Sequence, residues 1–107
     1  MNILITGASG FIGFNLLNKL SANKKYKILA LSRKKNFNKI SKNIKTLKSD
    51  LAMSSSSFNL IKVFSPQILI HLAWQDIPDF SPEKSQLNLI QSLDFISLVE
   101  SLIIFIE

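Results

Sequence analysis

The chain has 107 residues, of which 47% are hydrophobic, and it carries a formal net charge of +6 at pH 7. This length and composition support one hydrophobic core and therefore one domain at most. The chain has no cysteine and a single histidine, which excludes disulfides and thiolate metal sites and leaves a transition-metal site short of ligands. We therefore predict no metal site.

No stretch has the roughly 20 consecutive apolar residues that a bilayer crossing needs. The most apolar segment, residues 95–106, is interrupted by Ser97, Glu100 and Ser101. The first residues contain a short apolar run without a basic segment before it, unlike a secretory signal. We expect a soluble protein with no membrane partner, located in the cytoplasm.

The positive charge is concentrated in one segment. Eight of the 13 basic residues fall within residues 24–42, where the aromatic residues are Tyr26 and Phe37. No recognisable nucleic-acid-binding motif accompanies them. We expect a solvated basic face with a local phosphate contact, and no nucleic-acid partner.

Apolar periodicity in the first half of the chain predicts alternating strands and helices. Residues 2–5 predict a first strand, residues 27–31 a second, and the alternating residues 44–48 a third, nearer the sheet edge. Residues 32–43 are polar and basic and predict a loop or a weak helix. The helix between the first two strands is predicted by apolar residues at helical spacing, namely Phe11, Ile12, Leu16, Leu17 and Leu20.

The next segment continues the alternation. A serine run at residues 54–57 predicts the start of a helix that ends before Ser65 and Pro66, because proline disfavours helical geometry in the preceding residue. Residues 67–73 predict a fourth strand. Its nearly continuous apolar run is typical of the middle of a parallel sheet.

A long helix is predicted at the end of the chain. Ser81, Pro82 and Glu83 supply a cap, a first-turn proline and a first-turn acid. Strands that alternate with helices in this way predict an α/β fold built on a doubly wound parallel sheet. The apolar stripe of the last helix includes Leu87, Ile90, Leu93, Ile96, Val99 and Ile103.

All three glycines lie in one turn between the first strand and the first helix, at positions 7, 10 and 13. A tight turn, the close approach of backbone N–H groups to a pyrophosphate, and close helix packing each favour a residue without a side chain. The helix start adds a partial positive charge. A nucleoside-triphosphate P-loop is disfavoured because Phe14 and Asn15 follow Gly13. The turn predicts dinucleotide binding, with a structural turn as the alternative.

Residues 6–13, Thr-Gly-Ala-Ser-Gly-Phe-Ile-Gly, resemble the TGxxGFIG signature of the extended short-chain dehydrogenase/reductases. That family includes nucleotide-sugar epimerases and dehydratases. Asp50 and Leu51 resemble its acidic–hydrophobic pair at the adenine ring, residues 71–74 resemble the strand end beside the cofactor, and Asn88 matches a typical helix asparagine. The resemblance covers essentially the whole chain, and its first motif is the most specific.

The resemblance implies that residues 1–107 are the N-terminal part of an NAD(P)-binding Rossmann-like domain. We expect the doubly wound parallel sheet to be truncated after about four strands, without the substrate domain. The expected cofactor-binding residues are Gly7, Ser9, Gly10, Phe11, Ile12, Gly13, Ser32, Arg33, Asp50, Leu51, Leu72 and Ala73.

The end of the second strand bears on the choice of cofactor. An acidic residue there would hydrogen-bond the adenosine ribose of NAD. The sequence instead has Ser32 and Arg33, and Arg33 can pair with a 2′-phosphate through a charge-assisted hydrogen bond. We predict a preference for NADP over NAD, although these side chains could also be merely solvated.

Catalysis in the family uses a Ser or Thr and a Tyr-x-x-x-Lys pair. The sole tyrosine here, Tyr26, is followed four residues later by Ala30. We predict no catalytic residue and no turnover by these 107 residues alone. Two functions stay open: the cofactor-binding portion of an epimerase, dehydratase or reductase acting on a nucleotide-linked sugar, with a possible homodimer in the parent protein, and a non-catalytic NADP-binding or sensing module.

Five further residues invite over-interpretation as functional groups. We expect His71 to be a structural residue at its strand end and not a catalytic base. Asp76, Asp79 and Glu83 could be mistaken for an acid/base pair or a metal site, but loop solvation and the electrostatics of a helix start explain them. Trp74 follows the carboxyl end of the fourth strand, where core packing and a cover over the cofactor are equally open.

Overall fold

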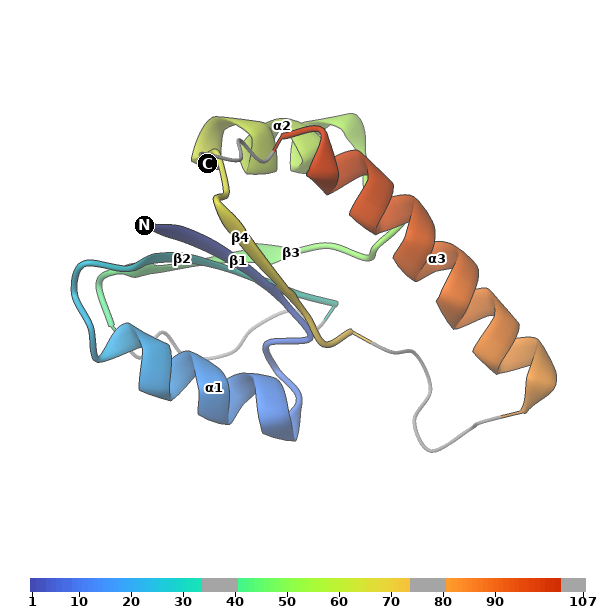
Figure 1. Cartoon of the computed structure of the whole chain (residues 1–107), viewed down its shortest axis with the longest axis horizontal. Helices are drawn as coiled ribbons and strands as arrows, with labels where there is room; N and C mark the ends of the chain where they lie inside the picture. The colour runs from blue at the N-terminus through green and yellow to red at the C-terminus, as the bar shows by residue number, and fades with distance from the viewer. Residues whose placement is uncertain (34–40, 74–80, 103–107) are drawn as a thin grey trace.

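The computed structural model describes residues 1–33, 41–73 and 81–102. Its strands are β1 (Asn2–Thr6), β2 (Lys27–Ser32), β3 (Ile44–Lys48) and β4 (Ile68–His71), and its helices are α1 (Phe11–Ser21), α2 (Ser55–Phe64) and α3 (Pro82–Glu100). Helix α1 covers one face of the sheet, whereas α2 and α3 lie over the other (Figure 1). The predicted α/β fold with helices on both faces is confirmed.

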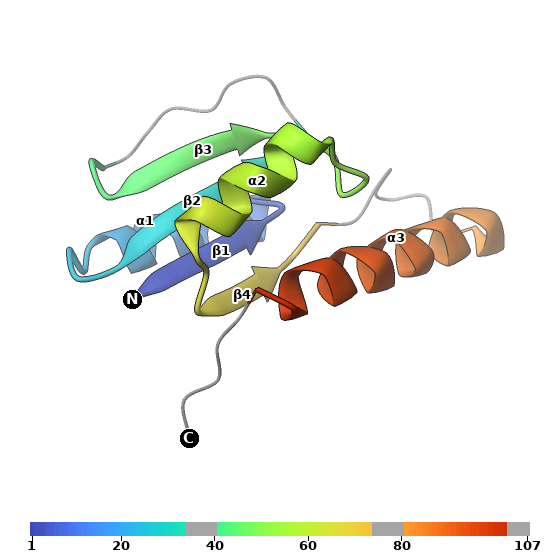
Figure 2. The same cartoon turned by 90° about the horizontal axis from the view of Figure 1, so that it is seen from above.

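The four strands are parallel and lie side by side in the order β3-β2-β1-β4 (Figure 2). β1 is central, since Ile3 pairs with Ile28 of β2 and with Ile68 of β4. The prediction that β3 lies at the sheet edge is confirmed. The predicted central position of β4 is not seen in the described sheet, where β4 pairs with β1 alone and ends at His71.

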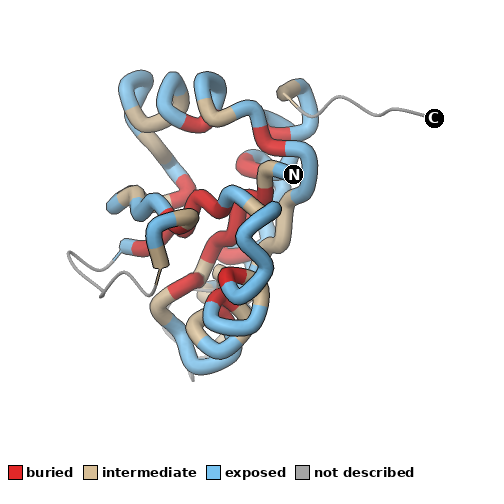
Figure 3. Tube along the Cα trace, turned by 90° about the vertical axis from the view of Figure 1, so that its left-hand side faces the viewer, coloured by how far each residue is buried: buried red, intermediate tan, exposed pale blue. Residues whose placement is uncertain are grey.

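Two hydrophobic clusters lie on either side of the sheet. The buried residues that contribute to them are red along the trace in Figure 3. Alternate residues of β1 point to opposite faces, so Ile3 packs toward Leu17 of α1 and Leu4 packs with Ile61 of α2. Because both faces are covered, β1 and β2 are apolar along nearly their whole length. The sheet thereby holds the carboxyl ends of β1, β2 and β4 in fixed relation.

The side of α3 that packs on the sheet differs from the predicted apolar stripe. Of the stripe residues in the described part of the chain, only Val99 is buried, and the others are from 38% to 55% exposed. The buried positions of α3 are Asn88, Ser92, Phe95 and Val99.

No helix in the described ranges is long and apolar enough to cross a membrane.

Candidate functional site

Gly7 directly follows β1 and packs against the backbone that follows β4. Its φ angle is +68°, in the left-handed region that favours glycine. A Cβ on this residue would lie 2.7 Å from the carbonyl carbon of Leu72 and 2.8 Å from the amide nitrogen of Ala73. The peptide between Leu72 and Ala73 therefore packs directly on the turn, with no room for a side chain.

The other two glycines differ in what the protein itself requires of them. A Cβ on Gly13 would lie 2.1 Å from the carbonyl oxygen of Gly7, so the packing of α1 on the turn requires glycine there. Among the described residues, a Cβ on Gly10 would meet that oxygen alone, at 3.3 Å. Gly10 is also exposed. The fold thus depends on Gly7 and Gly13 far more than on Gly10.

The first turn of α1 carries no capping side chain. Ser54 and Ser81 each accept a backbone hydrogen bond at the start of α2 and α3, whereas Gly10 at the start of α1 has no side chain to do so. The first turn of α1 also contains no acidic residue. Phe11 and Ile12 in that turn are 87% and 69% exposed. The positive end of the helix dipole is therefore open to an anion.

The turn is also attached to β2. Ser9 Oγ lies 2.7 Å from Ser32 Oγ, and the amide of Ala8 donates to the carbonyl of Leu31 at 3.4 Å. Ser32 is only 4% exposed, whereas Arg33 directly after it is exposed. The structure therefore brings the glycine turn together with the ends of β2 and β4, with Arg33 at the surface.

Asp50 and Leu51, the pair after β3 that is expected at the adenine ring, differ in burial. Asp50 is half-buried, and one of its carboxylate oxygens accepts a hydrogen bond from the amide of Leu51 at 2.8 Å. The Leu51 side chain is 8% exposed and packs with Ile61. The amide of Ser49 reaches the carbonyl of Ser32 at 2.9 Å, which places this segment beside the end of β2.

Two functional candidates that the sequence did not reveal, Thr6 and Ser92, flank His71. The Thr6 hydroxyl lies 2.7 Å from His71 Nδ1, and Ser92 Oγ lies 2.9 Å from His71 Nε2. Phe95 stacks on the imidazole with ring centroids 5.6 Å apart, and burial lowers the pKa of His71. The sequence signal for Ser92 is its spacing of four residues from Asn88, which places both on one side of α3.

The predictions for Trp74, Asp76 and Asp79 concern residues outside the described part of the chain.

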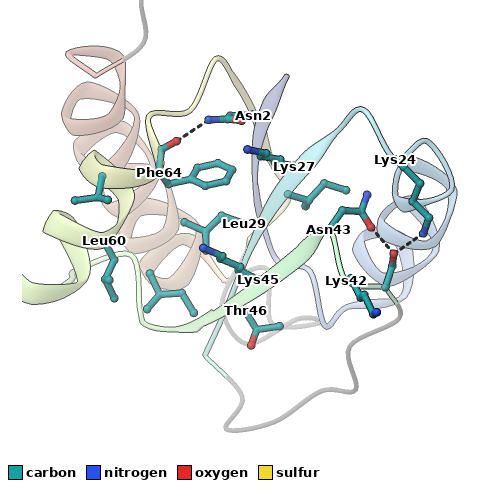
Figure 4. Close-up of a pocket in the computed structure, with 14 residues that line it drawn as sticks. Asn2, Lys24, Lys27, Leu29, Lys42, Asn43, Lys45, Thr46, Leu60 and Phe64 are labelled. Atoms are coloured by element: carbon teal, nitrogen blue, oxygen red, sulfur yellow. Dashed lines mark hydrogen bonds between the residues drawn. The ribbon is translucent and has the colours of Figure 1, made fainter.

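A basic hollow of about 900 Å³ lies at the opposite, amino edge of the sheet. Its charged lining residues are Lys24, Lys27, Lys42 and Lys45, drawn with their neighbours in Figure 4. Lysines on an edge strand such as β3 discourage pairing with another chain, which explains part of this basic lining without a ligand. The carboxyl edge with its glycine turn is therefore the stronger candidate site.

In the described part of the chain, no group of acidic, histidine or cysteine side chains could hold a metal ion.

A profile of the NAD dependent epimerase/dehydratase family matches residues 3–92. The chain belongs to this family. No curated protein matches the sequence of this epimerase/dehydratase-family chain. The fold is also shared with solved structures, among which three illustrate the range.

UDP-glucose 4-epimerase of Thermus thermophilus, in complex with NAD, superposes on the epimerase/dehydratase-family chain with a TM-score of 0.73 and 22% identity, over 95% of this chain and 34% of that chain. L-threonine dehydrogenase of Clostridium difficile superposes with a TM-score of 0.72 and 27% identity, over 94% of this chain and 33% of that chain. A short chain dehydrogenase of Leptospira borgpetersenii with bound NAD⁺ superposes with a TM-score of 0.69 and 20% identity, over 94% of this chain and 43% of that chain. The chain thus spans between a third and less than half of the length of these proteins.

Proposed function

We propose that the chain binds a nicotinamide dinucleotide across the carboxyl edge of its sheet, with the pyrophosphate on the glycine turn and the first turn of α1. The observation that carries this proposal is Gly10. Gly10 is exposed, and an added Cβ would meet the Gly7 carbonyl oxygen at 3.3 Å, a tight contact that a shift of a few tenths of an ångström relieves, so packing within the described residues demands glycine less there than at Gly7 or Gly13. A phosphate bound at the uncapped helix start would require glycine at position 10, because a side chain there would keep the phosphate away from the backbone N–H groups.

Family membership and the position of the site support the same proposal. Ligands of open α/β sheets bind outside the carboxyl ends of the strands, where the glycine turn lies. In the proposed complex, Gly7, Ser9, Phe11, Ile12 and Gly13 surround the pyrophosphate with Gly10. Asp50 and the backbone of Leu51 face the adenine, and the backbone of Leu72 and Ala73 lies along the cofactor. The bound dinucleotide would supply a hydride acceptor or donor.

We further propose that the preferred cofactor is NADP. Arg33 is exposed directly after β2, at the place where an acidic residue would select the free ribose of NAD. Its guanidinium can pair with a 2′-phosphate in two parallel hydrogen bonds. Ser32 is bonded to Ser9 and nearly buried, so its proposed contribution is to hold the turn beside Arg33.

For the whole protein we propose epimerisation, dehydration or reduction of a nucleotide-linked sugar by hydride transfer. Family membership supports this class of reaction. The cofactor-binding residues lie at the carboxyl edge of the sheet, whereas Tyr26 is half-buried against the hydrophobic cluster beneath α1, before the start of β2. We therefore propose that Tyr26 has no role in the reaction. A binding or sensing module is the second candidate function, and it too rests on the dinucleotide site.

Isothermal titration calorimetry with NADP and NAD tests the proposal. The wild-type chain should bind at least one of them, and Gly10→Ala should weaken that binding at least tenfold while leaving the fold intact. Asn18→Ala, an exposed substitution elsewhere on α1, is the matched control and should bind as wild type does. Equal affinity of Gly10→Ala and wild type would contradict a pyrophosphate on this turn.

A further inference from the structure

The hydroxyl of Thr6 has three hydrogen-bond partners at the end of β4. It lies 2.7 Å from His71 Nδ1 and accepts from the amide of Leu72 at 3.0 Å and the amide of Ala73 at 3.2 Å. A threonine hydroxyl has one proton and two acceptor lone pairs. Because the two amides occupy both lone pairs, the hydroxyl proton is directed to His71, and Nδ1 must accept it.

This assignment fixes the tautomer of the imidazole. A neutral ring that accepts at Nδ1 carries its proton on Nε2. Nε2 lies 2.9 Å from Ser92 Oγ and therefore donates to that hydroxyl. Ser92 is 9% exposed on the side of α3 that faces the sheet, and Phe95 from the same side stacks on the ring. Thr6, His71 and Ser92 thus form a hydrogen-bond relay with one direction.

The relay ends at the backbone that packs on the glycine turn. The amides held by the Thr6 hydroxyl belong to Leu72 and Ala73, and their shared peptide is the group that a Cβ on Gly7 would strike at 2.7–2.8 Å. We infer that His71, in its neutral form protonated on Nε2, is a positioning residue that sets the Leu72–Ala73 backbone for the dinucleotide, and that its protonation weakens dinucleotide binding. The inference rests on the proposed cofactor site and adds its regulation by pH.

Protonation breaks the relay for a geometric reason. A second proton on the ring would sit on Nδ1 and point at the Thr6 hydroxyl, whose lone pairs are already taken by the Leu72 and Ala73 amides. Two donors would then face each other across 2.7 Å. The hydroxyl has to give up one of the amides or turn away from the ring. Because the Leu72 amide also donates to the backbone carbonyl of Thr6 at 3.3 Å, the loss falls chiefly on the Ala73 amide, and the backbone there can then move from the position in which it packs on Gly7.

Within the part of the chain that the structure describes, the elements around the imidazole place no charged side chain beside it that would stabilise the protonated ring. β1 and β4 contain no other titratable side chain. On α3, Glu83, Asp94 and Glu100 are exposed, and Lys84 is half-buried two turns before Ser92, about 12 Å away along the helix at 1.5 Å per residue. Burial alone lowers the pKa of His71 below its ordinary value of 6.5. The neutral ring therefore predominates at pH 7.

The first experiment reads the tautomer directly. His71 is the single histidine of the chain, so its two ring nitrogens give unambiguous signals in a long-range ¹H–¹⁵N spectrum of the whole chain. At pH 7.5 the spectrum should show the proton on Nε2. The titration of the same signals gives the pKa of the ring in the folded protein, without any need for a cofactor.

The second experiment measures the dissociation constant of NAD from pH 7.5 down through the pKa of His71 that the titration of the ring gives. NAD is the better probe because a 2′-phosphate itself titrates near pH 6. Wild type should lose affinity about fivefold as His71 becomes protonated, as expected for one lost hydrogen bond. His71→Asn keeps an acceptor for Thr6 but cannot titrate, so its affinity should stay flat across this range. His71→Leu has no acceptor and should bind about fivefold more weakly than His71→Asn at pH 7.5.

Different results overturn the inference and the proposed function. A proton on Nδ1 at pH 7.5, or the same pH profile of NAD affinity in wild type and His71→Asn, overturns the role of His71. The absence of both NAD and NADP binding by folded wild type at pH 7.5 overturns the proposed function. The ring spectrum still reports the relay in that case, which keeps the two failures distinct.

Discussion

The α-carbon of Gly13 faces the carbonyl oxygen of Gly7 so closely that a Cβ would lie 2.1 Å from it. Because the obstacle is backbone and not the flexible end of a side chain, Gly13→Ala has to move α1 away from the turn. We expect this overpacking to lower the free energy of unfolding by about 1–3 kcal/mol. Urea unfolding followed by circular dichroism measures the change.

The matched control is Gly10→Ala in the same turn. Its Cβ would approach the Gly7 oxygen only to 3.3 Å, and its φ of −73° suits alanine. The expected loss of stability is below about 1 kcal/mol, the cost of placing alanine at a helix N-cap. Equal destabilisation by the two substitutions would show that packing explains all three glycines and would remove the argument for a ligand.

The Ser9–Ser32 contact predicts coupling between the glycine turn and β2. The two hydroxyl oxygens are 2.7 Å apart, and Ser32 is 4% exposed. A double-mutant cycle with Ser9→Ala and Ser32→Ala should give a coupling energy of about 0.5–1.5 kcal/mol in urea unfolding. Ser54→Ala at the start of α2 should be additive with Ser32→Ala, and strictly additive behaviour of Ser9 and Ser32 would refute the contact.

Cofactor selection by Arg33 is tested by one charge substitution. Arg33→Ala should weaken NADP binding about 10- to 100-fold, because a charge-assisted hydrogen bond contributes about 1.5–3 kcal/mol, and should change NAD binding little. Lys25→Ala is the matched control, since it removes an exposed cation at the other edge of the sheet. Titration calorimetry with both cofactors gives the ratio of the dissociation constants for NAD and NADP. An unchanged ratio in Arg33→Ala would show that Arg33 does not select the cofactor.

The stability of the chain should depend on pH through His71. Burial lowers the pKa of His71 in the folded state, while the unfolded chain retains the ordinary value of 6.5. The unfolded state therefore binds more protons below pH 6.5, so the stabilising contribution is present above this pH and is lost as the pH falls through the folded pKa. The urea midpoint of wild type should fall more between pH 7.5 and 5.5 than that of His71→Asn. Parallel midpoints would contradict this prediction.

Much of the fold could be predicted because local signals and tertiary packing agree. The glycine turn, the apolar β1 and β2, and the caps at Ser54 and Ser81 each point to the element that the structure contains. The side of α3 that packs on the sheet could not be predicted in this way. Its polar residue Ser92 is buried next to His71, with which it shares a hydrogen bond, and hydrophobic periodicity does not register such a pair.

The candidate site divides in the same way. The glycine positions could be predicted because backbone geometry imposes them locally. The relay could not, since Thr6 and His71 are 65 residues apart and His71 and Ser92 are 21 apart. The register of β1 with β4 pairs Thr6 with His71, and the packing of α3 on the sheet brings Ser92 to the same ring.

The most direct test of the account is calorimetric titration of the folded chain with NADP and NAD, beside Gly10→Ala. We predict binding of one dinucleotide per chain, tighter for NADP, and at least tenfold weaker in Gly10→Ala at nearly unchanged stability. A wild-type chain that unfolds cooperatively in urea and yet binds neither dinucleotide would contradict the central claim.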